Sequence, residues 1–321
     1  MEKTELIQAI RRLCSEKKAV VMAHYYQEKD VQDVADVIGD SLALARKAAQ
    51  TQADIIVLCG VNFMGETAKI LCPGKKVLVP DNTAGCSLAD SCQAADLARF
   101  REAHPGYQVI SYVNTSAAVK ALSDVVVTSG NAVEIVNSFP QDEKLIFGPD
   151  RNLGRYINEL TGRRMLLWDG ACLVHDRFSA AGIEALKAAH PQALVVCHPE
   201  CRRDVVEISD YAGSTAGILK YVQQSPALEF IVATESGVLH QMRHQCPGKT
   251  LLPAPANLPP EVAARSADGS NLCLDMRLNT LEKLYRCLRD ESPEIDIDSQ
   301  LAAQAVKPIR RMLDISARLG L

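Results

Sequence analysis

The sequence predicts an α/β protein of three similar three-layer domains, each with a parallel sheet, around a pseudo-threefold axis with the active site at its centre. Short β-branched runs alternate with longer helical stretches along the chain, which is typical of parallel βα units. The same landmarks also return at intervals of 88 and 86 residues. The length of 321 residues is sufficient for two or three domains at ~150 residues each.

Each repeat begins with a strand-like run that ends at a polar ring residue. These ring residues are His24, Tyr112 and His198. Two positions further along the chain are Tyr26, Asn114 and Glu200. Because ligands gather at the carboxyl ends of parallel strands, these equivalent positions predict one shared pocket. Taken singly, each side chain could instead satisfy the backbone of a loop.

A hydroxyl side chain begins a helical pattern seventeen positions after each ring residue. The three are Ser41, Ser129 and Thr215. Each is a candidate helix N-cap. Helix starts also attract phosphate or carboxylate groups, so three of them at one axis predict a substrate set with about three anionic groups.

Further apolar runs lie around Leu58, Ile146 and Val232. A closing strand then completes each unit. We expect these strands at residues 76–81, 165–169 and 250–255.

The repeats divide the chain into four parts. Residues 1–86 form the first α/β repeat with its N-terminal helix, 87–172 the second and 173–270 the third. Residues 271–321 contain a further loop and two helices, around 279–289 and 301–318, which are candidates to pack on the first domain. The acidic stretch 290–298 between these helices is predicted to be a solvated connector.

One loop cysteine close to a glycine follows the closing strand of each unit. These are Cys86, Cys172 and Cys273. If equivalent loops meet at the axis, the three thiols come together there. Three thiolates suit a 4Fe-4S cluster that has one iron without a protein ligand, since full ligation takes four cysteines. Such an iron can act as a Lewis acid and help hydroxide to leave, which predicts dehydration chemistry.

Two alternatives apply to these cysteines. Any single cysteine in an apolar protein can be a small core residue, which is the interpretation we give to Cys14, Cys59, Cys92, Cys197 and Cys287. The short spacing between Cys172 and His175 would also suit a zinc site with three cysteines and one histidine.

In the pocket at the strand ends, Glu200 with a tyrosine or histidine would suffice for proton transfer, and the sequence leaves open which group is the acid and which is the base.

The net charge and the pI indicate which kind of partner the protein binds. The formal charge is -4 and the pI about 6.0, with no block of lysine and arginine, which argues against nucleic acid and membrane surfaces and for small molecules. The first residues lack the apolar region of a secretory signal, so we expect a cytoplasmic protein whose eleven cysteines stay reduced.

Several motifs together resemble the quinolinate synthase (NadA) family. They include residues 23–27, 39–42, 60–69, 85–89, 112–114, 128–130, 168–175, 198–200, 213–215 and 271–276. The resemblance covers most of the chain. It implies condensation of iminoaspartate with dihydroxyacetone phosphate to quinolinate, with loss of phosphate and water, in the biosynthesis of NAD. It also implies a 4Fe-4S cofactor and L-aspartate oxidase as a functional partner.

The resemblance carries over residue by residue. It implies that Cys86, Cys172 and Cys273 ligate the cluster and that Tyr26 and Glu200 transfer protons, with Tyr112 and His198 nearby. The positions that it implies for binding substrate and phosphate are His24, Ser41, Asn114, Ser129 and Thr215. Some relatives have a Cys-x-x-Cys pattern at the third ligand, but here only Cys273 is present, so thiol–disulfide control is not expected.

Two rival functions remain at this point. One is another three-domain cluster enzyme, such as the diphthamide-forming radical enzyme that uses S-adenosylmethionine. The His-Tyr-Tyr segment at 24–26 and the His-Pro-Glu segment at 198–200 favour the synthase. The other rival is a zinc-stabilised binding protein without catalytic activity.

Overall fold

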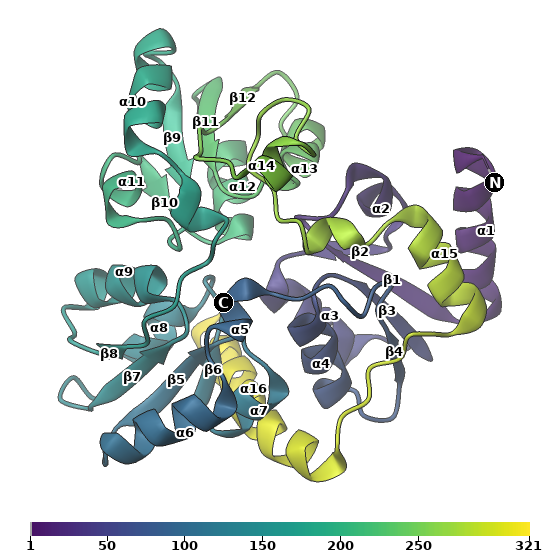
Figure 1. Cartoon of the computed structure of the whole chain (residues 1–321), viewed down its shortest axis with the longest axis horizontal. Helices are drawn as coiled ribbons and strands as arrows, with labels where there is room; N and C mark the ends of the chain where they lie inside the picture. Colours follow the sequence, from purple (N-terminus) through teal and green to yellow (C-terminus); the bar gives the residue numbers. More distant parts are fainter. Residues whose placement is uncertain (1) are drawn as a thin grey trace.

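The computed structural model describes residues 2–321. Its strands form three separate four-stranded sheets. In Figure 1 the three sheet-containing units are arranged around a common centre.

The first unit begins at the N-terminus. Its strands are β1 (Ala19–His24), β2 (Val37–Gly39), β3 (Ile55–Cys59) and β4 (Lys76–Leu78). Its helices are α1 (Lys3–Glu16), α2 (Lys29–Val34), α3 (Ser41–Gln50) and α4 (Asn62–Leu71), followed by the short α5 (Ser87–Asp90). The strand order is β2-β1-β3-β4, and every pairing is parallel.

The second and third units repeat this arrangement. The second has β5 (Gln108–Tyr112), β6 (Val125–Val127), β7 (Leu145–Gly148) and β8 (Leu166–Leu167), with α6 (Ala94–Ala103), α7 (Ala117–Ala121), α8 (Ala132–Asn137), α9 (Arg151–Thr161) and the 3-10 turn η1 (His175–Arg177). The third has β9 (Leu194–Cys197), β10 (Tyr211–Ala212), β11 (Glu229–Ala233) and β12 (Thr250–Pro253), with α10 (Ala180–Ala189), α11 (Arg203–Glu207), α12 (Thr215–Gln224), α13 (Val238–Gln245) and α14 (Pro260–Ala263).

The strand orders are β6-β5-β7-β8 and β10-β9-β11-β12, the same topology as in the first sheet. The predicted class, three similar α/β units with parallel sheets, is therefore confirmed.

Alternation along the first strands explains the three layers. Val21 and Ala23 of β1 pack with residues of α1 and α2, whereas Met22 between them packs with α3 and α4. In β9, Val195 packs with α10 and α11, and Val196 packs with α12 and α13. Because successive side chains point to opposite faces, a strand that is apolar at every position needs helices on both sides.

The structure adds one short strand to each sheet that the sequence pattern did not predict. β2, β6 and β10 are two or three residues long, too short to show a period. An aspartate precedes each of them, and its carboxylate accepts a hydrogen bond from the first strand. The pairs are Asp36 with the N–H of Val21 (2.8 Å), Asp124 with that of Val109 (2.7 Å) and Asp210 with that of Val195 (2.7 Å).

The expected N-caps are wrong by one or two positions. Asp40 caps α3 by accepting from the N–H of Ala43 at 3.0 Å, and Ser214 caps α12 by accepting from that of Gly217 at 3.1 Å. Ser41 and Thr215 are the first helical residues instead, and Ser129 lies three residues before α8. An N-cap needs extended backbone, which Asp40 and Ser214 supply.

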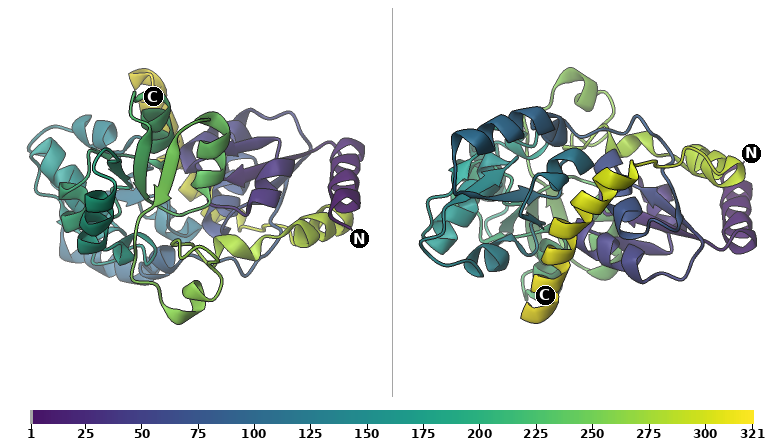
Figure 2. Two further views of the ribbon diagram at one scale, coloured as in Figure 1. Left: turned by 90° about the horizontal axis from the view of Figure 1, so that it is seen from above. Right: turned by 90° about the horizontal axis from the view of Figure 1, so that it is seen from below.

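The C-terminal residues contact two units. After η2 (Met276–Leu278), helix α15 (Leu281–Asp290) packs on α1, with Leu284 and Leu288 buried against Leu6 and Ile10. The final helix α16 (Ser299–Leu319) crosses to the second unit and packs on α7 and β6. The right-hand view in Figure 2, seen from below, shows α16 lying along that face.

The acidic connector between α15 and α16 is less solvated than predicted. Glu291 forms ion pairs with Lys17 and Lys76, and Glu294 lies 3.1 Å from Lys69. The backbone N–H of Ile295 donates to the carbonyl of Val77 at 2.8 Å. The acidic side chains therefore neutralise lysines of the first unit. Among the described residues, every helix is too short or too polar to span a lipid bilayer.

Candidate active site

One cavity lies where the three units meet, and it is lined from all of them. Every site residue predicted from the sequence is part of its wall: His24, Tyr26, Ser41, Cys86, Tyr112, Asn114, Ser129, Cys172, His198, Glu200, Thr215 and Cys273. The shared topology explains the convergence, because equivalent strand ends and loops face the same centre. The wall also contains residues that had no predicted catalytic role, among them Asp40, His175, Glu235 and Met276.

The three loop cysteines share a local geometry. The sulfur of Cys86 accepts hydrogen bonds from the backbone of Leu88 and Ala89. Cys172 accepts from the backbone of His175, and Cys273 accepts from that of Asp275 and Met276. In each loop, the backbone N–H groups that point at the cysteine sulfur therefore belong to residues two or three positions after that cysteine.

Burial dominates the acidity of these thiols. It raises the pKa of Cys86 and of Cys273 to about 12, and it raises the pKa of Cys172 well above the usual value. Such thiols keep their protons at neutral pH unless a cation replaces them. Three buried sulfurs with N–H donors already directed at them form a donor set that fits an iron–sulfur cluster.

Buried polar side chains hold two of the cysteine loops. Asp150 accepts a hydrogen bond from the N–H of Cys172 at 3.0 Å. Glu235 accepts one from the N–H of Cys273 at 3.2 Å and is paired with Arg277 at 2.8 Å. In the first unit, Asn62 takes the same place and donates to the carbonyl of Asn82 at 2.9 Å.

These three side chains follow β3, β7 and β11, at 38, 38 and 37 positions after the ring residues. Sequence reasoning missed them. Comparing equivalent positions in the three repeats would have identified this set as well.

Glu200 is buried between two histidines. Its carboxylate lies 2.8 Å from Nδ1 of His175 and 3.9 Å from Nδ1 of His198. The two imidazole rings are stacked, with centroids 4.5 Å apart. Burial alone would raise the pKa of Glu200, but hydrogen bonds from His175 and Tyr112 outweigh it and lower the pKa below its ordinary value. Glu200 is therefore a carboxylate at neutral pH.

A chain of hydrogen bonds runs from His175 to Tyr26. Nε2 of His175 lies 2.9 Å from the hydroxyl of Thr234, which lies 2.8 Å from the hydroxyl of Tyr26. Tyr26 also contacts the hydroxyl of Thr215 at 2.7 Å. Burial raises the pKa of Tyr26 well above the usual value, so its phenol is a neutral hydrogen-bond donor. Glu200, His175, Thr234 and Tyr26 thus form one connected polar network.

His24 and His198 occupy equivalent positions and behave alike. Nδ1 of each ring accepts the backbone N–H two residues later, from Tyr26 at 3.2 Å and from Glu200 at 3.3 Å. Burial lowers the pKa of both histidines to about 3, so the rings are neutral. With Nδ1 accepting, the proton of each ring is on Nε2. In His198 this nitrogen lies 3.2 Å from the hydroxyl of Ser129.

Comparison with known proteins agrees with this geometry. A sequence model of the family described as quinolinate synthetase A protein matches residues 8–314. The chain belongs to this family.

Individual relatives are similar over nearly their whole length. The chain is 53% identical over 312 residues to quinolinate synthase of Microcystis aeruginosa. The aligned region covers 97% of this chain and 95% of that protein. It is also 53% identical to the quinolinate synthases of a Nostoc species and of Thermosynechococcus vestitus. Both alignments cover 97% of this chain, and they cover 94% of the Nostoc protein and 96% of the Thermosynechococcus protein. Membership in the family confirms the resemblance found in the motifs, and it disfavours both rival functions.

Proposed function

We propose that this chain is a quinolinate synthase, which condenses iminoaspartate with dihydroxyacetone phosphate and releases phosphate and water. The observation that carries the proposal is the cavity in which the three thiols, Glu200, two tyrosines and two neutral histidines lie together. Family membership over residues 8–314 supports it. The product places the reaction in NAD biosynthesis, and an oxidase acting on L-aspartate would supply the imine.

Cys86, Cys172 and Cys273 would hold the 4Fe-4S cluster. When bound, this cluster supplies a Lewis-acidic iron that polarises a substrate oxygen and helps hydroxide to leave. Within residues 2–321, three cysteines line the cavity, so one iron corner of a bound cluster would be open to the substrate.

The proton transfers belong to the network around Glu200. As a carboxylate, Glu200 can take a proton from a substrate carbon, and His175 orients it through the 2.8 Å contact. Tyr26 and Tyr112 are buried neutral phenols whose pKa values are raised by burial, so they donate hydrogen bonds to oxygens on which negative charge develops. We assign Glu200 as the base and the tyrosines as donors.

Neutral groups must bind the anionic substrates. Among the described residues, no lysine or arginine lines the cavity. Ser41 and Thr215, the first residues of α3 and α12, present their hydroxyls to the cavity, while Asp40 and Ser214 already accept from the N–H groups of Ala43 and Gly217. Asn114, Ser129 and the Nε2–H groups of the histidines add donors. This arrangement suits two carboxylates and a phosphate without adding a fixed positive charge beside the cluster.

The decisive experiment uses anaerobically purified protein. About four iron and four sulfide per chain, with quinolinate formed from the two substrates, are the expected results. Stoichiometric zinc without sulfide would reject the cluster. A loaded cluster without quinolinate formation would reject the reaction and favour another cluster enzyme.

A further inference from the structure

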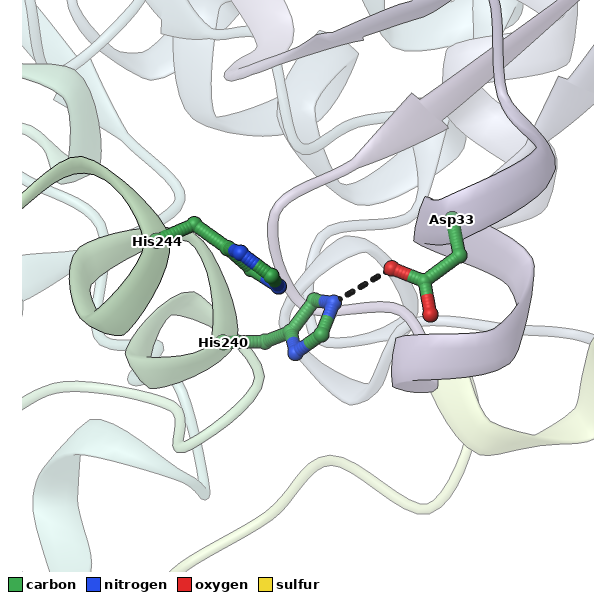
Figure 3. Close-up of side chains that lie close together, drawn as sticks. All are labelled: Asp33, His240 and His244. Atoms are coloured by element: carbon green, nitrogen blue, oxygen red, sulfur yellow. Dashed lines mark hydrogen bonds and ion pairs between the residues drawn. The ribbon is translucent and has the colours of Figure 1, made fainter.

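A second group of metal-ligating side chains lies away from the cavity, at the contact between the first and third units. It consists of Asp33 on α2 and of His240 and His244 on α13, and Figure 3 shows the three side chains directed toward one another. One ligand atom from each lies within 4.8 Å of the other two. Nε2 of His240 is 2.6 Å from the carboxylate of Asp33. The two imidazole rings meet edge to face, with centroids 4.6 Å apart.

The spacing and the residue types both suit a transition metal. His240 and His244 are four residues apart on one helix, so their side chains lie on the same face. Two imidazoles at this spacing with one carboxylate are a typical ligand set for zinc and related first-row ions. The third ligand comes from a different unit, so the group depends on the tertiary fold and not on the helix alone.

We propose that Asp33, His240 and His244 form a zinc-type site that joins the first unit to the third, with water completing the coordination. Bonds of ~2.0–2.1 Å in a tetrahedral site bring ligand atoms to ~3.3 Å from one another. Asp33 and His244 are exposed and His240 is half-buried, so their side chains can rotate to that spacing without disturbing the core. The ion would replace the direct bond between His240 and Asp33.

The site lies beside the turn that carries Tyr26. The amide of Gln32, next to Asp33, donates to the carbonyls of Tyr25 (3.0 Å), Gln27 (2.9 Å) and Gly237 (3.0 Å). A side chain at Gly237 would meet the carbonyl oxygen of Tyr25 at 2.8 Å, so the start of α13 packs directly against this turn. An ion between α2 and α13 would therefore stabilise the packing of these helices, which holds the Tyr25–Gln27 turn in place.

The test measures zinc bound to the cluster-loaded protein. Wild type and the variants His244→Ala, His240→Ala and Asp33→Asn are dialysed anaerobically against micromolar zinc chloride, and zinc and iron are then counted. His190→Ala is the matched control, because His190 is also a surface histidine near a carboxylate, 3.6 Å from Glu229. We expect each site variant to bind one zinc fewer per chain, or to bind it at least ~10-fold more weakly, with unchanged iron content. His190→Ala should bind as wild type does.

Thermal unfolding gives a second measurement. Zinc should raise the melting temperature of wild type and of His190→Ala, but not that of the three site variants. Asp33→Asn lies on a different element from the histidines, so it still tests the site if substitutions in α13 disturb the helix. Equal zinc content and equal melting shifts in wild type and Asp33→Asn would overturn the proposal and leave an ordinary ion pair between His240 and Asp33.

Discussion

The carboxylate of Glu200 is buried and ionised. The imidazole of His175 and the phenol of Tyr112 hold it in its ionised form although its side chain is almost fully enclosed. A buried charge of this kind is costly unless it is paired and hydrogen-bonded. Hydrogen bonds from His175 and Tyr112 supply that pairing and leave Glu200 ionised in the cavity wall.

Glu200→Gln should remove the base and keep the shape of the side chain. We expect kcat for quinolinate formation to fall by ~10²–10⁴, the usual contribution of a positioned acid or base. Anaerobic steady-state kinetics with iron analysis provide the measurement, and the iron content should not change. Glu207→Gln, on the exposed side of the same unit, is the control and should retain full activity. Activity within a few-fold of wild type would contradict the assignment of Glu200.

The two neutral histidines make stability depend on pH. Burial lowers the pKa of His24 and His198 to about 3, whereas an unfolded histidine has a pKa near ~6.5. Between these values the unfolded chain binds more protons, so the free energy of unfolding decreases as the pH falls, by up to ~1.4 kcal/mol per pH unit for each histidine.

Urea unfolding at pH 7.5 and pH 5.5 tests this dependence. His24→Gln keeps an acceptor for the N–H of Tyr26 but cannot titrate, so it should lose less stability than wild type over the same interval. Parallel pH profiles for the two proteins would show that His24 is not buried in its neutral form.

At the scale of elements, the cysteine loops depend on the side chains that follow β7 and β11. Asp150 accepts from the N–H groups of both Leu153 and Cys172, at 2.8 and 3.0 Å. It thereby ties the start of α9 to the loop of the second cysteine. Glu235 does the same for the third cysteine through Cys273 and Arg277.

Asp150→Ala should leave two N–H groups without a partner, at ~1–3 kcal/mol for each group that stays buried. We expect a lower melting temperature and loss of iron during anaerobic purification. Asp210→Ala is the control, because Asp210 accepts from Val195 at the amino end of β9, away from the cavity. It should reduce stability and keep the iron. Equal iron content in both variants would show that Asp150 does not position the cysteine loop.

Much of this fold was predictable because its signals repeat. Apolar periodicity identified the strands and helices, and equivalent landmarks in three repeats identified the residues that line one cavity. The edge strands β2, β6 and β10 were missed because two or three residues carry no period. The helix starts at Ser41 and Thr215 were predicted correctly from their equivalent positions, but the N-caps were expected at these hydroxyls, whereas the backbone geometry assigns the caps to Asp40 and Ser214.

Other features depend on contacts between distant segments. Asp33 and His240 are 207 positions apart, and only the packing of α2 against α13 brings them together. The bond between His175 and Thr234 likewise joins the loop of the second cysteine to the end of β11. No local pattern in the sequence encodes such pairs, so the zinc-type site and the network to Tyr26 could be found only from the structure.

At the scale of the whole molecule, the C-terminal residues connect the units. α15 covers one face of the first unit, and α16 continues onto the second, where Ile309 and Met312 are fully buried. Truncating a core side chain of this size leaves a cavity that costs ~2–5 kcal/mol.

Ile309→Ala should therefore lower the melting temperature although it lies outside the three repeats. Thermal unfolding of cluster-loaded protein checks this, with Leu319→Ala, exposed at the end of the same helix, as the control. An equal effect of the two substitutions would mean that α16 does not stabilise the second unit.

The cavity needs all three units at once, and the cysteines give the sharpest test of that requirement. Cys86, Cys172 and Cys273 come from successive repeats, yet they line the same cavity. If they share one cluster, Cys86→Ser, Cys172→Ser and Cys273→Ser should each lower the iron content to a similar extent and abolish quinolinate formation.

Cys92→Ser is the matched control for these variants. Cys92 is buried in the second unit outside the cavity, so its substitution should keep both iron and activity. Full iron content in any one of the three variants would exclude that cysteine as a ligand, because a cluster already lacking its fourth thiolate is not expected to survive the loss of another.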